Sequence, residues 1–230
     1  MGTIDSTNDE ALRRLEKEDL PIPCLIAARA QTQGRGRHRG RLWLGEEGNL
    51  FATCVTKMPE GMLMTHLSLF VACAVYRSVR SFIDSSVSLT VKWPNDVLLN
   101  DQKVAGILIE TGPHDTVLIG IGVNIASAPV LSLPHQATCL KAFISHVTIE
   151  QYTSALMHAL EALFKAWKNQ GFSVILMEWQ RCAQGLGQRI SFRIGQGGVQ
   201  GIFERLNPDG HLVLRLPNEE VRVITSGEVQ

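Results

Sequence analysis

VSLTVKWPNDVLLNDQKVAGILIE spans residues 87–110, and TVLIGIGVN spans residues 116–124. Apolar residues alternate or run together in both stretches, as they do in half-buried and fully buried strands. The polar triplet Asn-Asp-Gln at residues 100–102 is typical of a hairpin turn, and Gly-Pro-His-Asp at residues 112–115 turns the chain again. Because successive strands joined by short turns pair antiparallel, the sequence predicts an α+β fold with a mixed, largely antiparallel central sheet.

Amphipathic helices flank this meander. Apolar residues at helical spacing predict helices over residues 65–82, 151–167 and 173–182. Ser6-Thr7-Asn8-Asp9 has the pattern of a capping box and predicts the start of a further helix. Short apolar runs at residues 24–30 and 50–56 predict two more strands.

The residue pattern of the chain changes from residue 187 onward. Short strand patterns follow one another there, separated by turns that contain Gly, Pro and Asn. Closely spaced strands of this kind are typical of a small β-barrel. We therefore expect two domains, residues 1–184 and residues 185–230.

Composition limits the classes of function. The 230 residues include 22 Lys and Arg against 22 Asp and Glu, and this balance argues against a nucleic-acid coat or a polybasic membrane binder. No apolar run approaches the roughly 20 residues of a membrane span. Five cysteines, without a C-x-x-C pair or a signal peptide, indicate reduced thiols in the cytoplasm. We expect neither a nucleic-acid nor a membrane partner.

The segment QTQGRGRHRGR at residues 31–41 is the most unusual part of the chain, with four arginines and no acid between Leu20 and Gly45. Crowded cations repel one another unless an anion neutralises them, and Arg matches phosphate and carboxylate with paired donors. Glycines let backbone N–H groups approach such an anion. The loop therefore predicts a site for phosphates, a carboxylate or both. A solvated basic loop and an arginine–glycine nucleic-acid contact are the alternatives.

Three later segments carry further candidate residues. Asn95 and Asp96 follow Pro94 at a strand end, where they can reach a ligand or Mg²⁺ or form an Asx turn. Lys103 opens an apolar strand, and an ammonium on a rigid strand can stabilise developing negative charge, although a solvated lysine is the simpler alternative. Glycines in GIGVN, residues 120–124, indicate either close approach of a ligand or a bulge.

Taken in order, these motifs resemble biotin protein ligase. The resemblance runs from Ile4 to Ile125 through Ser-Thr-Asn, the Gly-Arg-Gly-Arg loop, KWPND, KVAGILIE and GIGVN, and continues more weakly to Gly227-Glu228-Val229. It implies a catalytic domain like that of class II synthetases, with flanking helices, followed by an SH3-like β-barrel. The loop is one residue longer between Arg37 and Gly40 than the family's usual form.

The resemblance implies an activity as well. Biotin protein ligases use ATP and Mg²⁺ to join biotin to one lysine of a biotin carboxyl carrier protein through biotinyl-5′-AMP. Both steps rest on positioning and charge stabilisation, which agrees with the absence of a nucleophile motif in the sequence. No helix-turn-helix precedes Ser6, so we expect a ligase without a repressor role. The oligomeric state stays open, a homodimer included.

The family's functional residues carry over by motif. The resemblance places Lys103 and Arg37 in catalysis, and Asp96 is the candidate magnesium ligand. The residues implied for biotin are Ser6, Thr7, Asn8, Gln31, Gly34, Arg35, Gly36, Arg37, Lys103, Gly106 and Gly122. The residues implied for ATP are Arg37, Arg39, Arg41, Trp43, Lys92, Asn95, Asp96 and Asn124.

Two other functions remain as alternatives. A lipoate or octanoate ligase of similar fold would need a long apolar tunnel in place of the polar Ser-Thr-Asn end. A non-enzymatic RNA-binding module would use the arginine loop and the small barrel, and it predicts salt-dependent binding without ATP turnover.

Overall fold

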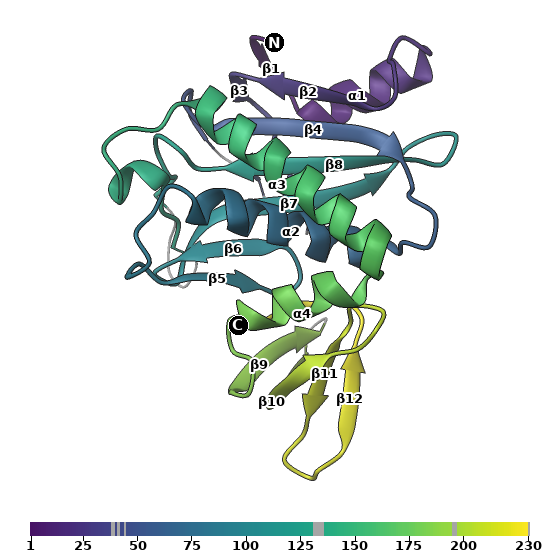
Figure 1. Cartoon of the computed structure of the whole chain (residues 1–230), viewed down its shortest axis with the longest axis vertical. Coiled ribbons are helices and arrows are strands. Elements are labelled where there is room, and N and C mark those ends of the chain that lie inside the picture. Colours follow the sequence, from purple (N-terminus) through teal and green to yellow (C-terminus); the bar gives the residue numbers. More distant parts are fainter. Residues whose placement is uncertain (38–39, 41, 44, 131–135, 195–196, 230) are drawn as a thin grey trace.

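The structure, a computed structural model, describes residues 1–37, 40, 42–43, 45–130, 136–194 and 197–229. Its centre is a six-stranded sheet of order β2-β4-β8-β7-β6-β5, in which every neighbouring pair is antiparallel (Figure 1). The strands are β2 (Cys24–Ala28), β4 (Leu50–Lys57), β5 (Leu89–Lys92), β6 (Asp96–Leu99), β7 (Gln102–Thr111) and β8 (Thr116–Val123). The meander expected from β5 to β8 is confirmed. Parallel pairing occurs between β1 (Thr3–Ile4) and β3 (Ala30–Gln31).

Two turns of the meander use left-handed backbone. Asn100 and Asp101, with φ of 45° and 61°, join β6 to β7. His114 and Asp115, with φ of 54° and 58°, join β7 to β8. Asn and Asp adopt this conformation more readily than most residues because their short side chains bond to nearby backbone groups. The turn residues seen in the sequence therefore set the strand order of this part of the sheet.

The predicted helices are present, with ends shifted by a few residues. They are α1 (Thr7–Glu16), α2 (Met64–Arg80), α3 (Ile149–Gln170) and α4 (Ser173–Arg181), and a short 3₁₀ turn covers Leu140–Ala142. Helices α2 and α3 cover one face of the sheet, and α1 lies against the other face near β4 and β8 (Figure 1). Among the described residues, no helix is both long enough and apolar enough to cross a membrane.

Strand β8 divides its side chains between the two faces. Val117, Ile119, Ile121 and Val123 belong to the core beneath α2 and α3, whereas Leu118 belongs to a small cluster beneath α1. Because side chains alternate along a strand, Gly120 and Gly122 face the α1 side, where they leave the sheet surface bare. Gly106 of β7 lies directly opposite Gly122 in the register.

The start of α1 differs in part from the expected capping box. Ser6 is the N-cap, and its hydroxyl accepts a hydrogen bond from the backbone N–H of Asp9, as predicted. The return bond is not made by Asp9, because the Asp5 carboxylate accepts from the Ser6 N–H at 2.7 Å. The side chain of Asp9 is instead held by Arg35.

The C-terminal strands form an open sheet, so the prediction of a closed barrel is wrong. The order is β12-β11-β10-β9-β13, and the described pairings do not join β12 to β13. The strands are β9 (Arg189–Ile194), β10 (Gly197–Leu206), β11 (Leu212–Arg215), β12 (Val221–Ile224) and β13 (Glu228–Val229). Strand β13 has two residues and pairs with β9. Aromatic pairs Trp93–Phe192 and Trp179–Phe203 pack this sheet onto the rest of the chain.

Candidate active site

A cleft lies on the bare glycine face of the sheet, beside the start of α1. It holds about 490 Å³ of empty volume. Its walls come from the first turn of α1, from the loop after β3, and from strands β4, β7 and β8. The predicted site residues that line it are Ser6, Thr7, Asn8, Gln31, Arg35, Gly36, Arg37, Trp43, Asn95, Lys103, Gly106 and Gly122.

The α1 end of the cleft is polar and tightly bonded. Ser6, Thr7 and Asn8 are each 4% exposed. The side-chain oxygen of Gln31 accepts hydrogen bonds from the Thr7 backbone N–H at 2.7 Å and from the Thr7 hydroxyl at 3.0 Å. The Gln31 amide is thereby oriented with its oxygen toward α1, which leaves its N–H donors for the cleft. This end can therefore exchange hydrogen bonds with a neutral polar ligand.

Asn8 occupies the space above Gly120. A Cβ atom at position 120 would lie 2.7 Å from the Asn8 side-chain oxygen, so a larger residue would displace the amide. The Asn8 amide donates to the Glu110 carboxylate at 2.7 Å and accepts from the hydroxyl of Thr53. Both groups of the amide are thus satisfied by the protein, and its orientation is fixed.

The two described arginines of the loop have different surroundings. Arg35 donates to the carboxylates of Asp9 and Glu110, and its hydrogen bond to Asp9 is the main cause that raises the pKa of its guanidinium. Arg37 donates to the backbone carbonyl of Gly227 at 3.2 Å, and its guanidinium lies 6.0 Å from the centre of the Trp93 ring. The loop is therefore linked both to the sheet and to the C-terminal strands.

Lys103 brings its ammonium to the opposite wall of the cleft. Its Nζ lies 2.6 Å from Oδ1 of Asp96 and 5.3 Å from the centre of the Trp43 ring. The Lys103 side chain is one-third exposed. Asp96 and the indole therefore hold the ammonium in a fixed place while it stays accessible to a ligand.

Trp43 packs against the glycine face. A Cβ atom on Gly122 would lie 2.3 Å from the Trp43 ring, and one on Gly106 would lie 2.9 Å from it. The indole N–H of Trp43 is buried and has no hydrogen-bond partner among the described residues. The glycines thus make room for an aromatic ring.

The other predicted residues lie around the cleft or outside the described residues. Asn95 lines the cleft, and its amide donates to the carbonyl of Ile107 at 2.7 Å. Asn124 is buried and donates to the carbonyl of Thr138 at 3.1 Å. The predicted residues that do not belong to the described lining are Gly34, Lys92, Asp96 and Asn124. Arg39 and Arg41 lie outside the described residues, as does His38.

Three residues of the site were missed by sequence reasoning. Thr53 is fully buried and is hydrogen-bonded to Thr7. Asp9 and Glu110 hold Arg35. Glu110 lies on β7 four residues after Gly106, and this even spacing places both residues on the same face of the strand. That spacing was the available signal.

The donor set for a metal ion is sparse. Within the described part of the chain, no group of three or more His, Cys, Asp or Glu residues could hold one. Mg²⁺ in nucleotide sites is usually held by one or two carboxylates together with substrate phosphates. Asp96, beside the cleft, is compatible with that kind of site and not with a cage built of protein groups alone.

Comparisons with known proteins agree with this geometry. A model of the biotin/lipoate A/B protein ligase family matches residues 2–124, and a model of the biotin protein ligase C-terminal domain matches residues 185–230. The biotin–[acetyl-CoA-carboxylase] ligase of Paracoccus denitrificans is 37% identical over 100% of this chain and 98% of its own length. The bifunctional ligase/repressor BirA of Escherichia coli is 29% identical over 93% of this chain and 68% of its own.

The fold is also found among solved structures. The biotin protein ligase from Aquifex aeolicus in complex with biotin and ATP superposes with a TM-score of 0.84. It is 24% identical, and the match covers 100% of this chain and 96% of that one.

Proposed function

The chain belongs to the biotin/lipoate A/B protein ligase family and, within it, to the biotin protein ligases, so we propose that it attaches biotin to a protein lysine at the expense of ATP. The acceptor is the biotin carboxyl carrier protein of acetyl-CoA carboxylase, as the name of the Paracoccus relative implies. The observation that carries the proposal is one cleft in which a neutral polar end faces the cations of Arg37 and Lys103.

The first step joins biotin to the nucleotide. A biotin carboxylate oxygen attacks the α-phosphorus of ATP, pyrophosphate leaves, and biotinyl-5′-AMP is formed. Negative charge is shared between the carboxylate and phosphate oxygens in this step, so a fixed cation at that point lowers the barrier. We assign this role to Lys103 and Arg37. Mg²⁺ neutralises the phosphates when it is bound, and Asp96 would hold it.

The second step releases AMP. The carrier lysine amine attacks the acyl carbon of the mixed anhydride, and the bond to the phosphate oxygen breaks. No side chain of the protein has to form a covalent bond, so positioning of the two substrates is the main contribution. The polar end at Ser6, Thr7 and Gln31 supports recognition of the biotin ring, which both donates and accepts hydrogen bonds.

The proposal also includes a cytoplasmic location and a domain boundary. The five cysteines are free, which suits the reducing cytoplasm, where ATP is also available. The boundary near residue 185 is supported by the C-terminal family model, which begins there.

Pyrophosphate release from ATP tests the reaction directly. We expect release that depends on biotin, and release that is equal with and without biotin would contradict the proposal. A thermal-shift comparison identifies the acid, because a ligand at 100 times its Kd stabilises the folded state by about 2.7 kcal/mol. We expect biotin to raise the unfolding midpoint and lipoate to leave it unchanged. The reverse order would favour a lipoate ligase.

A further inference from the structure

The guanidinium of Arg35 is held between two carboxylates from different elements. One of its terminal nitrogens donates to both oxygens of Asp9, in the first turn of α1. The other donates to both oxygens of Glu110, near the end of β7, at 3.1 Å each. Two negative charges therefore surround one positive charge. A cation compensated in this way attracts an additional anion only weakly, because the nearby carboxylates oppose it.

Glu110 has a second partner inside the cleft. It accepts a hydrogen bond from the Asn8 amide at 2.7 Å, and an ionised carboxylate can only accept. The amide nitrogen of Asn8 must therefore point to Glu110 and the amide oxygen to Thr53. Glu110 thus joins the arginine loop to the buried polar group that ends at Thr7 and Gln31.

We propose that Glu110 is a positioning residue of the biotin site, which fixes the Asn8 amide and, together with Asp9, anchors the loop through Arg35. This inference rests on the proposed function. Neither carboxylate belongs to the described lining of the cleft, so each acts through the residue that it holds. The Arg35 guanidinium is accordingly an anchor for the loop.

Glu110→Gln is the sharpest substitution, because it keeps the shape, removes the charge and adds an N–H. The new amide no longer dictates the orientation of Asn8, and it weakens the hold on Arg35. We expect the KM for biotin to rise about tenfold, as for loss of a charge-assisted hydrogen bond, while the KM for ATP stays within about twofold. Equal changes in both KM values, or no change, would overturn the proposal.

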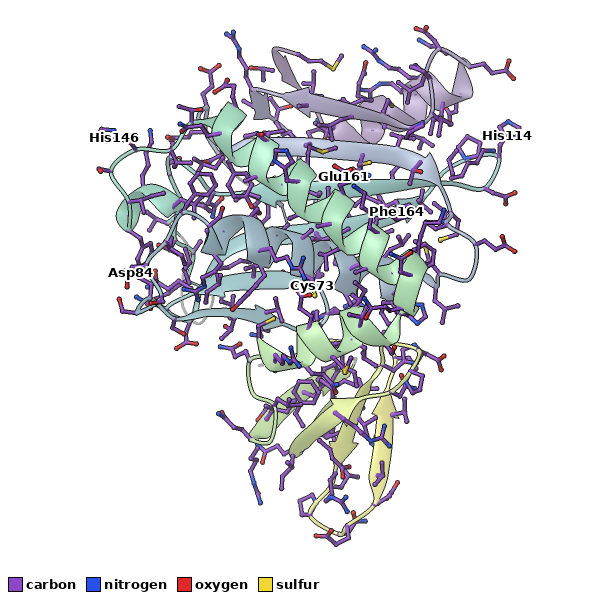
Figure 2. All side chains as sticks on the ribbon, viewed as in Figure 1. Cys73, Asp84, His114, His146, Glu161 and Phe164 are labelled. Atoms are coloured by element: carbon purple, nitrogen blue, oxygen red, sulfur yellow. The ribbon has the colours of Figure 1, made fainter. Side chains whose placement is uncertain are left out.

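Glu161→Gln is the matched control. Glu161, labelled on α3 in Figure 2, pairs with Lys165 at 2.6 Å, and both side chains are more than half exposed. Helix α3 lies on the opposite face of the sheet from the cleft. The same chemical change should therefore leave both KM values as they are in the unaltered protein.

A double-mutant cycle tests whether Glu110 acts through Arg35. Arg35→Gln and Glu110→Gln share one interaction, so we expect the double variant to raise the KM for biotin by less than the product of the two single effects. Fully multiplicative effects would show that the two residues act independently, and would overturn the anchoring role.

Hydrogen exchange in the ligand-free protein gives a readout that does not depend on activity. Backbone amides of residues 34–37 should exchange faster in Glu110→Gln than in the unaltered protein or in Glu161→Gln, because the loop loses one anchor. Unchanged exchange would overturn the proposal. If the unaltered protein released no pyrophosphate with biotin, the proposed function would fail, and this exchange comparison would still decide the role of Glu110.

Discussion

Replacing Lys103 by Met separates the catalytic use of its ammonium from its structural use. The Lys103 side chain is one-third exposed, and its ammonium is held by Asp96 at 2.6 Å. In the first step it would meet the charge that develops on the carboxylate and phosphate oxygens. A hydrogen bond to a charged group is worth about 1.5–3 kcal/mol, and partial exposure favours the lower part of this range. We therefore expect Lys103→Met to slow adenylate formation by about 10- to 50-fold.

The same change has a cost in stability that must be controlled. Oδ1 of Asp96 is buried, and Lys103→Met leaves it without its counter-charge. An unpaired buried acceptor costs about 1–3 kcal/mol of unfolding free energy, which corresponds to a midpoint lowered by several degrees. The double variant Lys103→Met/Asp96→Asn removes that charge and should recover most of the midpoint.

Single-turnover pyrophosphate release, measured beside thermal unfolding, decides between the two uses. Asp96→Asn alone is the reference, because Asp96 is also the proposed magnesium ligand. We expect the double variant to regain stability and to remain slower than this reference. If its rate recovered together with its midpoint, or if the single variant reacted at the unaltered rate, Lys103 would be structural and the assignment of its catalytic role would be wrong.

Three other predictions follow from contacts in the cleft and at the C-terminal sheet. Gly122→Ala should weaken biotin binding by about 5- to 150-fold in calorimetric titration, since its Cβ would lie 2.3 Å from the Trp43 ring; unchanged binding would refute the close packing. Arg37→Gln should slow single-turnover adenylation by about tenfold without loss of fold, and an unaltered rate would remove Arg37 from the mechanism. Burial is the main cause that lowers the pKa of His66, and it outweighs the Pro208 carbonyl and the Asp209 carboxylate, which both raise it. The unfolded chain therefore takes up a proton more readily below pH 6.5, so the free energy of unfolding should decrease as the pH is lowered through that window. His66→Gln should flatten the pH dependence of the unfolding midpoint, and an equally steep curve would contradict this reasoning.

The sequence predicted most of the fold because local signals and the final pairing agree. Asn100 and Asp101 indicate a turn in the sequence and adopt left-handed backbone in the structure, and the strands on either side are neighbours in the sheet. Closure of the C-terminal strands was predicted wrongly, because strand patterns show how many strands follow one another but not whether the outer ones meet. In the described sheet the two outer strands, β12 and β13, are not paired with each other.

Some residues of the site were predicted from the sequence and others were missed. Motifs located Thr7 and Gln31, which are 24 positions apart and meet because Ile4 of β1 pairs with Gln31 of β3. Strands of two residues have no visible period, so this meeting could not be derived from hydrophobic pattern. Glu110 was missed for another reason: a charge near a strand end is usually solvated, and only the packed structure shows that it bonds to Arg35 and Asn8.

The cleft and the core are produced by the same alternation in β8. Odd-numbered positions from Val117 to Val123 are apolar and face α2 and α3, whereas Leu118, Gly120 and Gly122 occupy the even positions on the other face. A shift of the register by one residue would exchange the two sets, placing glycines in the core and branched side chains where Asn8 and Trp43 lie. The packing that stabilises the sheet therefore also leaves the space that Asn8 and Trp43 occupy beside the cleft. Because any register that filled the cleft would also lose the core, folding energy selects the site together with the fold.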